Sequence, residues 1–155
     1  MLIHGAHNRS IDFNLFAFEY SPVAFHPVDD WVEMDFHLKD EKQGWHVTDA
    51  SLTAAEVMRL AGWLHDIGEK RTVQKDLYFM EPNLSFHLNY DYGKTKIILI
   101  TFNAELRPGW YKEEGQYCIL GHVGNRQLLQ LAKSLTEQLD ELYIKSGVDV
   151  GSMVH

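Results

Sequence analysis

Two short motifs place charged side chains beside prolines and are the first candidates for a chemical site. Glu81-Pro82 precedes one alternating apolar run, and Glu105-Leu106-Arg107-Pro108 follows the next. Proline has no amide hydrogen to give to a sheet, so each proline is expected at a strand boundary. A turn joins the two runs, which predicts one antiparallel hairpin with both motifs at the same end of a sheet.

Two carboxylates and an arginine in one small volume suggest two kinds of chemistry. Paired carboxylates can act as a general acid and a general base. Arg107 favours a structural salt bridge instead, because a guanidinium can hold both strand ends through parallel bonds, with Trp110 as a cover. We therefore assign Glu81, Pro82, Glu105, Arg107 and Pro108 to architecture. A small-molecule or enzymatic pocket that uses Glu81, Glu105 and Arg107 is the alternative, and a deep cavity there would favour it.

Other patterns typical of enzymes are incomplete in this sequence. His65-Asp66 would need further histidines and aspartates on other helices to bind a metal, and the chain has too few helices. Cys118 lies within an apolar run, as a small buried residue would, without an activating helix N-terminus. The stretch 121–124 lacks the lysine and glycine pattern of a phosphate loop and reads as a strand-to-helix turn. We expect no catalytic residue and no enzymatic activity.

The nine histidines raise the question of a metal site. His37 and His46 are expected near one another across an early hairpin. No cysteine or carboxylate cluster completes a tetrahedron in the sequence pattern, so a surface pair is favoured. We expect no metal and no cofactor.

The net charge of -8 disfavours nucleic acid as a partner, because phosphate binding needs a basic surface. It suits a basic protein, although acidity also serves solubility alone. Carboxylates and tryptophans gather around one predicted hairpin, and a second acidic patch follows Trp110-Tyr111. The pattern fits either an interface or an ordinary solvated sheet face. The residues expected to contact a partner are Asp29, Asp30, Trp31, Glu33, Asp35, Trp110, Glu113 and Glu114.

The hydrophobic periodicity predicts an α+β fold. Alternating or apolar runs predict strands over 11–20, 31–38, 45–49, 77–80, 84–92, 97–102 and 116–120. The first run changes phase near Leu15, which predicts a bulge. Thr53 and Glu56 have capping-box spacing at the start of one helix, and leucines three and four apart predict a second helix over 128–142. The expected architecture is a mostly antiparallel sheet with two amphipathic helices packed on one face, which leaves the other face partly open.

We expect residues 1–155 to form a single domain, with loose termini over 1–10 and 147–155. The N-terminus lacks the features of a signal peptide, and no apolar run is long enough for a bilayer. The expected location is the cytoplasm, without membrane contact.

The order of these motifs resembles a known family. Glu-Pro-Asn-Leu-Ser-Phe over 81–86, Glu-x-Arg-Pro-x-Trp over 105–110 and a closing leucine-rich helix are similar to the WapI-type immunity proteins of bacterial contact-dependent toxin systems. The resemblance covers about residues 31–143. It departs at Gly109, where the family more often has a second proline, and it does not extend before Ile11.

The resemblance implies a small cytoplasmic antidote that binds the toxic C-terminal domain delivered by a neighbouring cell, often a nuclease. Together with the acidity, it predicts a non-catalytic protein that neutralises a basic nuclease by occlusion, as a monomer or weak homodimer. A structural homo-oligomer joined through the open sheet face or an edge strand is a third hypothesis.

Overall fold

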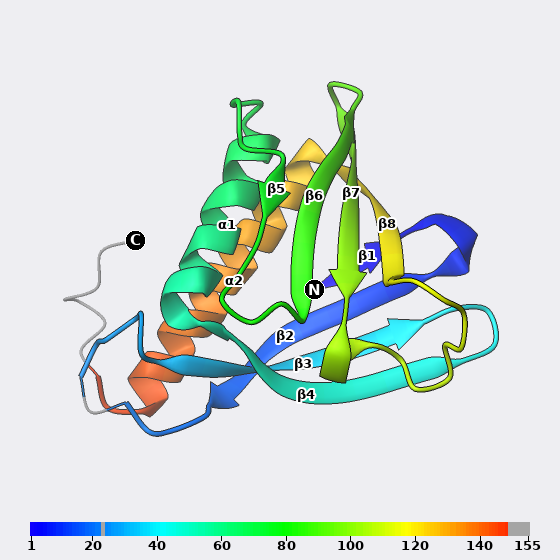
Figure 1. Cartoon of the computed structure of the whole chain (residues 1–155). Coiled ribbons are helices and arrows are strands. Elements are labelled where there is room, and N and C mark those ends of the chain that lie inside the picture. The colour runs from blue at the N-terminus through cyan, green and yellow to red at the C-terminus, as the bar shows by residue number, and fades with distance from the viewer. Residues whose placement is uncertain (23, 149–155) are drawn as a thin grey trace.

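The computed structural model describes residues 1–22 and 24–148. Its chain forms two four-stranded antiparallel sheets and two α-helices, which confirms the α+β class (Figure 1). The first sheet holds β1 (Leu2–His4), β2 (Ser10–Phe18), β3 (Trp31–Lys39) and β4 (Gly44–Thr53). The second holds β5 (Asp76–Leu77), β6 (Leu84–Asp91), β7 (Thr95–Phe102) and β8 (Tyr117–Gly124). The helices are α1 (Ala54–Gly68) and α2 (Asn125–Lys145).

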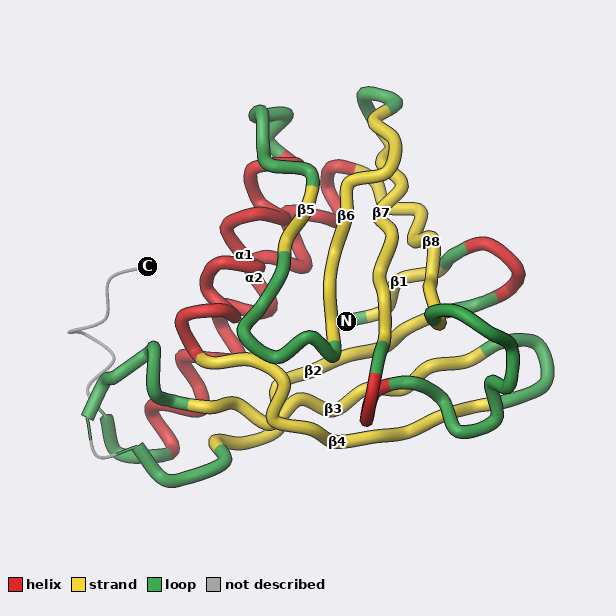
Figure 2. The backbone as a smooth tube through the Cα atoms, in the orientation of Figure 1, coloured by secondary structure: helices red, strands yellow, loops and turns green. Residues whose placement is uncertain are grey.

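The strands divide between two sheets, whereas the sequence pattern suggested one. In Figure 2 the strands of the second sheet run across those of the first, and both helices lie behind the second sheet. The two helices pack against each other, and α2 also contacts β2 and β8. The chain passes from the first sheet into α1 without a loop, since Thr53 is both the last residue of β4 and the N-cap of the helix.

The start of α1 has the predicted capping box. Thr53 Oγ1 accepts a hydrogen bond from the Glu56 amide at 3.2 Å, and Glu56 Oε1 accepts one from the Thr53 amide at 3.1 Å. Glu56 Oε2 also accepts from the Met80 amide at 2.7 Å. The pair therefore satisfies amides at the helix start and also ties α1 to the segment before β6.

Strand β3 shows why one sheet face is buried and the other is not. Val32, Met34, Phe36 and Leu38 are each 0% exposed and belong to the hydrophobic core. The residues between them, Glu33, Asp35 and His37, are partly exposed on the opposite face. This two-residue period makes the outer face of the first sheet polar.

The predicted bulge in β2 lies between Leu15 and Ala17, where the register against β3 shifts. The Leu15 amide donates to Gln138 Oε1 of α2 at 2.8 Å, and Gln138 Nε2 donates to Asn14 Oδ1 at 3.1 Å. A glutamine on the last helix thus satisfies backbone and side-chain groups at the bulge.

Residues 1–10 do not fit the expectation of a loose terminus. They form β1 and one 3₁₀ turn (Ala6–Asn8), and Ile3 is 2% exposed. Gly5 bridges Gly121 of β8, and a Cβ on Gly5 would lie 2.7 Å from the Leu120 carbonyl oxygen. Glycine is needed there because the two backbones approach so closely.

Two expectations at the other end of the chain have mixed outcomes. The stretch Gly121–Gly124 belongs to β8 and is strand up to Gly124, the N-cap of α2, so the expected turn over these four residues is wrong. Val148 packs against the core, and residues 149–155 of the expected loose tail lie outside the described part of the chain.

Cys118 was expected to be buried but is partly exposed, and its Sγ lies 3.5 Å from Thr101 Oγ1. Its neighbours Tyr117 and Ile119 are 0% exposed, so β8 turns Cys118 to the outer face of the second sheet. In residues 1–22 and 24–148, no helix is long and apolar enough to span a bilayer.

Candidate functional site

The densest group of chemically versatile side chains lies on the outer face of the first sheet. Asp35 and His37 of β3 stand opposite Thr48 and His46 of β4, respectively. Asp35 Oδ1 lies 2.5 Å from His46 Nε2 and 2.8 Å from Thr48 Oγ1, and Asp35 Oδ2 lies 3.3 Å from His37 Nε2. The two imidazole rings stack with centroids 4.0 Å apart. We call Asp35, His37 and His46 the Asp-His-His cluster.

Hydrogen bonding controls the charge of Asp35. Partial burial works to raise the pKa of this carboxyl, but the bonds from His46, Thr48 and His37 together outweigh it and hold the pKa below its usual value. Asp35 is therefore a fixed negative charge at neutral pH. The sequence pattern anticipated the pair of histidines but not the carboxylate between them.

The other predicted contacts at this hairpin have different surroundings. Asp29 is exposed at the end of the sheet, and Trp31 and Glu33 are partly exposed. Asp30 Oδ2 accepts from the Tyr143 hydroxyl at 2.5 Å and from the His26 amide at 3.1 Å. Asp30 thus holds the loop before β3 against α2, which limits its availability to a partner.

Trp110, Glu113 and Glu114 lie at the other end of the hairpin, in the loop between β7 and β8. Trp110 Nε1 donates to the Gly44 carbonyl at 3.2 Å, and its ring packs edge-on against Tyr117 at 5.6 Å. Glu113 and Glu114 are exposed. The eight predicted contacts therefore form two groups: five lie in β3 or just before it, and three lie in the loop between β7 and β8, which meets the start of β4 at Gly44.

The prediction that Arg107 forms a salt bridge with the two glutamates is wrong. Within the described ranges, Arg107 makes no ion pair with Glu81 or Glu105; it donates to the carbonyls of Gly115 and Glu113 instead. Both proline motifs do meet at one end of the sheet, since Leu84 pairs with Phe102. A 3₁₀ turn over Ala104–Leu106 then redirects the chain, so Arg107 faces its own loop and stacks on Tyr111 at 4.6 Å.

Asn83 is the residue that organises the two motifs. Its side chain is buried, and Nδ2 donates to Glu105 Oε2 at 3.0 Å and to Asp49 Oδ2 at 3.3 Å. Trp110 does not cover this group, because it packs on Tyr117. The sequence placed Asn83 within the Glu-Pro-Asn motif but offered no periodic signal for its burial.

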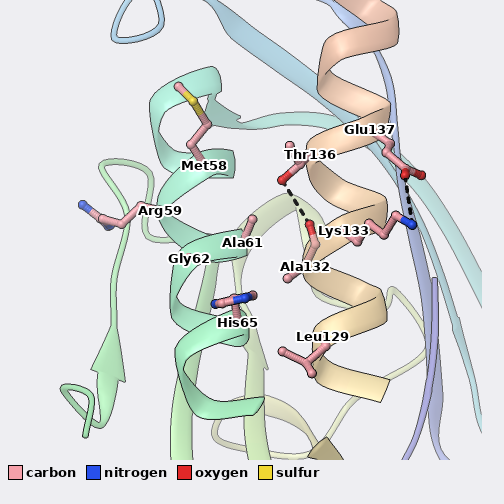
Figure 3. Close-up of a pocket in the computed structure, with 10 residues that line it drawn as sticks. All are labelled: Met58, Arg59, Ala61, Gly62, His65, Leu129, Ala132, Lys133, Thr136 and Glu137. Atoms are coloured by element: carbon pink, nitrogen blue, oxygen red, sulfur yellow. Dashed lines mark hydrogen bonds and ion pairs between the residues drawn. The ribbon is translucent and has the colours of Figure 1, made fainter. Parts of the chain in front are cut away.

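A pronounced hollow lies elsewhere in the described chain. A groove of about 700 Å³ runs between α1 and α2, lined by apolar groups such as Ala61 and Leu129 with Arg59, His65 and Lys133 at its sides (Figure 3). None of Glu81, Glu105 and Arg107 lines this groove or three smaller hollows on other parts of the surface. This groove therefore gives no support to the hypothesis of a pocket at the proline motifs.

Comparison with known proteins adds a family to this geometry. The model of the Immunity protein WapI-like family matches residues 1–142. The chain belongs to this family. The match includes the segment before Ile11, which the motif resemblance did not reach. No curated protein and no solved structure matches the chain. Membership implies a protein toxin as the partner and neutralisation as the function, and immunity proteins of this kind are generally non-catalytic.

Proposed function

We propose that this WapI-like protein neutralises a cognate toxin domain by binding it with the outer face of β1–β4 and covering its active surface, without catalysis. The observation that carries the proposal is the uncovered face itself. Glu33 and Asp35 lie on it, beside the exposed Asp29, in a chain of the immunity family. Both helices lie on the other side of this sheet's buried residues and do not cover it (Figure 1).

The charge of this face supports a basic partner. The chain carries a net charge of -8, and a carboxylate such as Asp35 stays ionised because hydrogen bonds lower its pKa. Complementary fields speed encounter and suppress wrong partners. We propose a basic nuclease domain as the toxin, because a surface that binds nucleic acid is itself basic.

The contacts that we propose are Asp29, Trp31, Glu33 and Asp35, with the exposed Glu113 and Glu114 as a second acidic group. A sheet face suits occlusion because hydrogen-bond ladders already fix its backbone, so little conformational freedom is lost on binding. Asp30 and Trp110 support the contacts from behind through Tyr143 and Gly44.

The test begins with this protein as bait in lysate of its source organism. Recovery of a large secreted protein, lost at high salt, would identify a candidate toxin. Its C-terminal domain is then expressed in a reporter strain, with and without this protein. Rescue of growth is the expected result, and light scattering of the mixture should show a heterodimer.

Charge reversal locates the interface. Glu33→Lys and Asp29→Lys should each slow association with the captured toxin domain about tenfold at low salt. Glu141→Lys is the matched control, since Glu141 is an exposed carboxylate on α2. If all three variants associate equally fast, the outer face of the first sheet is not the interface. If the toxin domain kills cells that carry this protein, neutralisation itself is refuted for that pair.

A further inference from the structure

We propose that the Asp-His-His cluster is a binding site for a divalent transition-metal ion, with Zn²⁺ as the best-matched ion. Asp35 supplies a carboxylate oxygen and His37 and His46 supply one imidazole nitrogen each. This site goes beyond the proposed function, since metal binding requires no toxin.

The distances suit one small ion. The three donor atoms all lie within 4.8 Å of one another. Zinc binds histidine nitrogen and carboxylate oxygen at about 2.0–2.2 Å, which places the donors of a tetrahedral site roughly 3.3 Å apart. Asp35 Oδ2 lies 3.3 Å from His37 Nε2, and Asp35 Oδ1 lies 2.5 Å from His46 Nε2, so the carboxylate must turn to present one oxygen to an ion held by both rings. An ion would replace the hydrogens that now join these atoms.

The side chains have room to make this adjustment. The side chains of His37 and His46 are 42% and 57% exposed, so neither ring is held by core packing. Their backbones are fixed as direct neighbours across the β3–β4 ladder, which keeps their Cβ atoms about 5 Å apart. The strands therefore preorganise the pair while the rings remain free to tilt from their stacked arrangement toward a shared ion.

The donor set selects the class of ion. Two imidazoles with one carboxylate suit zinc and its transition-metal neighbours, whereas Ca²⁺ and Mg²⁺ prefer six or more oxygen ligands. Three protein ligands leave one tetrahedral position for water or for a group from outside the chain.

Thr48 acts as a positioning residue for this site. Its hydroxyl donates to Asp35 Oδ1 at 2.8 Å and fixes the orientation of the carboxylate. Such partners of metal ligands commonly change affinity by about 10–100-fold when removed. This support is a feature that an accidental pair of surface histidines would lack.

The pattern of the sequence alone disfavoured a metal because no third ligand stood near the two histidines. The ladder supplies it: Asp35 lies one step along the same face, and the Asp35–Thr48 pair stands beside the His37–His46 pair. Residues two apart on a strand share a face, so the carboxylate and imidazoles converge once both strands are paired.

The experiment measures Zn²⁺ binding to the purified full chain by calorimetry and by competition with a chromophoric chelator. The wild type should bind one equivalent at this site. Asp35→Asn, His37→Gln and His46→Gln should each weaken that binding at least tenfold, and Thr48→Val should weaken it about tenfold with all three ligands intact. His122→Gln removes an exposed histidine of β8 and should change nothing.

Circular dichroism and the urea midpoint verify that each variant is folded. Zinc binding that is unaffected by Asp35→Asn and His46→Gln, or that falls equally in His122→Gln, would overturn the site. So would a wild type that shows no zinc binding in the calorimeter. None of these outcomes bears on growth rescue, so the proposed function is tested separately.

Discussion

Asn83 Nδ2 lies 3.0 Å from Glu105 Oε2, and this bond joins the start of β6 to the turn that follows β7. The same amide also reaches Asp49 Oδ2 of β4 at 3.3 Å. A buried side chain thus connects the two sheets through a pair of carboxylates. The family motif Glu81-Pro82-Asn83 owes its structural role to its last residue.

Replacing Asn83 should therefore destabilise the fold. Asn83→Ala leaves two carboxylates without their shared donor and should lower the free energy of unfolding by about 1–3 kcal/mol. Asn83→Asp should cost more at pH 7, because it adds a third negative charge to Asp49 and Glu105. Urea unfolding followed by circular dichroism measures both.

Asn89→Ala is the control for this series, since Asn89 lies on β6, which begins directly after Asn83, and is only partly buried. An equal loss in the Asn83 and Asn89 variants would contradict the role of the shared amide.

The Tyr143–Asp30 bond predicts a loss of stability at high pH. Burial first, and then the Asp30 carboxylate, raise the pKa of Tyr143 above its ordinary value. The folded chain therefore keeps a proton that the unfolded chain loses above about pH 10, so stability is complete below that pH and falls above it. The slope for one such group is at most about 1.4 kcal/mol per pH unit.

Tyr143→Phe should lower stability at pH 7 by about 1 kcal/mol and should flatten the decline between pH 10 and 11.5. Burial also raises the pKa of Tyr117, so part of the decline should persist in the variant. Thermal melts across this range give the comparison. Parallel curves for the two proteins would show that Tyr143 does not control the alkaline limb.

Gln138 should matter more than its place on a helix surface suggests. Gln138→Ala removes the acceptor of the Leu15 amide and the donor to Asn14, and should cost about 1–2 kcal/mol. Gln138→Glu keeps the acceptor and should cost less. Gln130→Ala, at an exposed position of α2, should be nearly neutral. If the urea midpoint of Gln138→Ala is not the lowest of the three, Gln138 does not support the bulge.

Because Lys96 is buried, replacing its partner Asp91 should destabilise the fold more than replacing Lys96 itself. Lys96 is 1% exposed, and its ammonium pairs with Asp91 Oδ1 at 2.7 Å and with the Gly93 carbonyl. Lys96→Met replaces a buried charge by an apolar chain and should change stability by less than about 1 kcal/mol. Asp91→Asn leaves the ammonium buried with a weaker partner and should be the less stable of the two.

The pH dependence of this pair has a defined sign. The bond from Lys96, and then that from the Gly93 amide, lower the pKa of Asp91 below its ordinary value. Its contribution is therefore present at neutral pH and is lost as the pH falls below about 4. Acid titrations of stability should show a shallower decline in Lys96→Met. A steeper decline would refute the pairing, and Lys133→Met, which breaks an exposed pair on α2, is the matched control.

Local chemistry along the chain was sufficient for several features. Thr53 and Glu56 are three residues apart, so their capping box needs nothing beyond one helical turn. The alternation of Val32, Met34, Phe36 and Leu38 predicts a strand with one buried face because successive side chains point to opposite sides. The order of the Glu-Pro-Asn and Glu-x-Arg-Pro-x-Trp motifs was sufficient for the family.

Tertiary structure alone decided which distant residues meet. Asn83 is 34 positions from Asp49 and 22 from Glu105, and no periodicity links such separations. Arg107 was expected at the carboxylates, but a single 3₁₀ turn carried it into its own loop. Asp35 and His46 meet because of the β3–β4 register, since a slip of β4 by one residue would send His46 to the opposite face from Asp35. The sequence by itself determined the elements and the family, and the pairing of strands determined the sites.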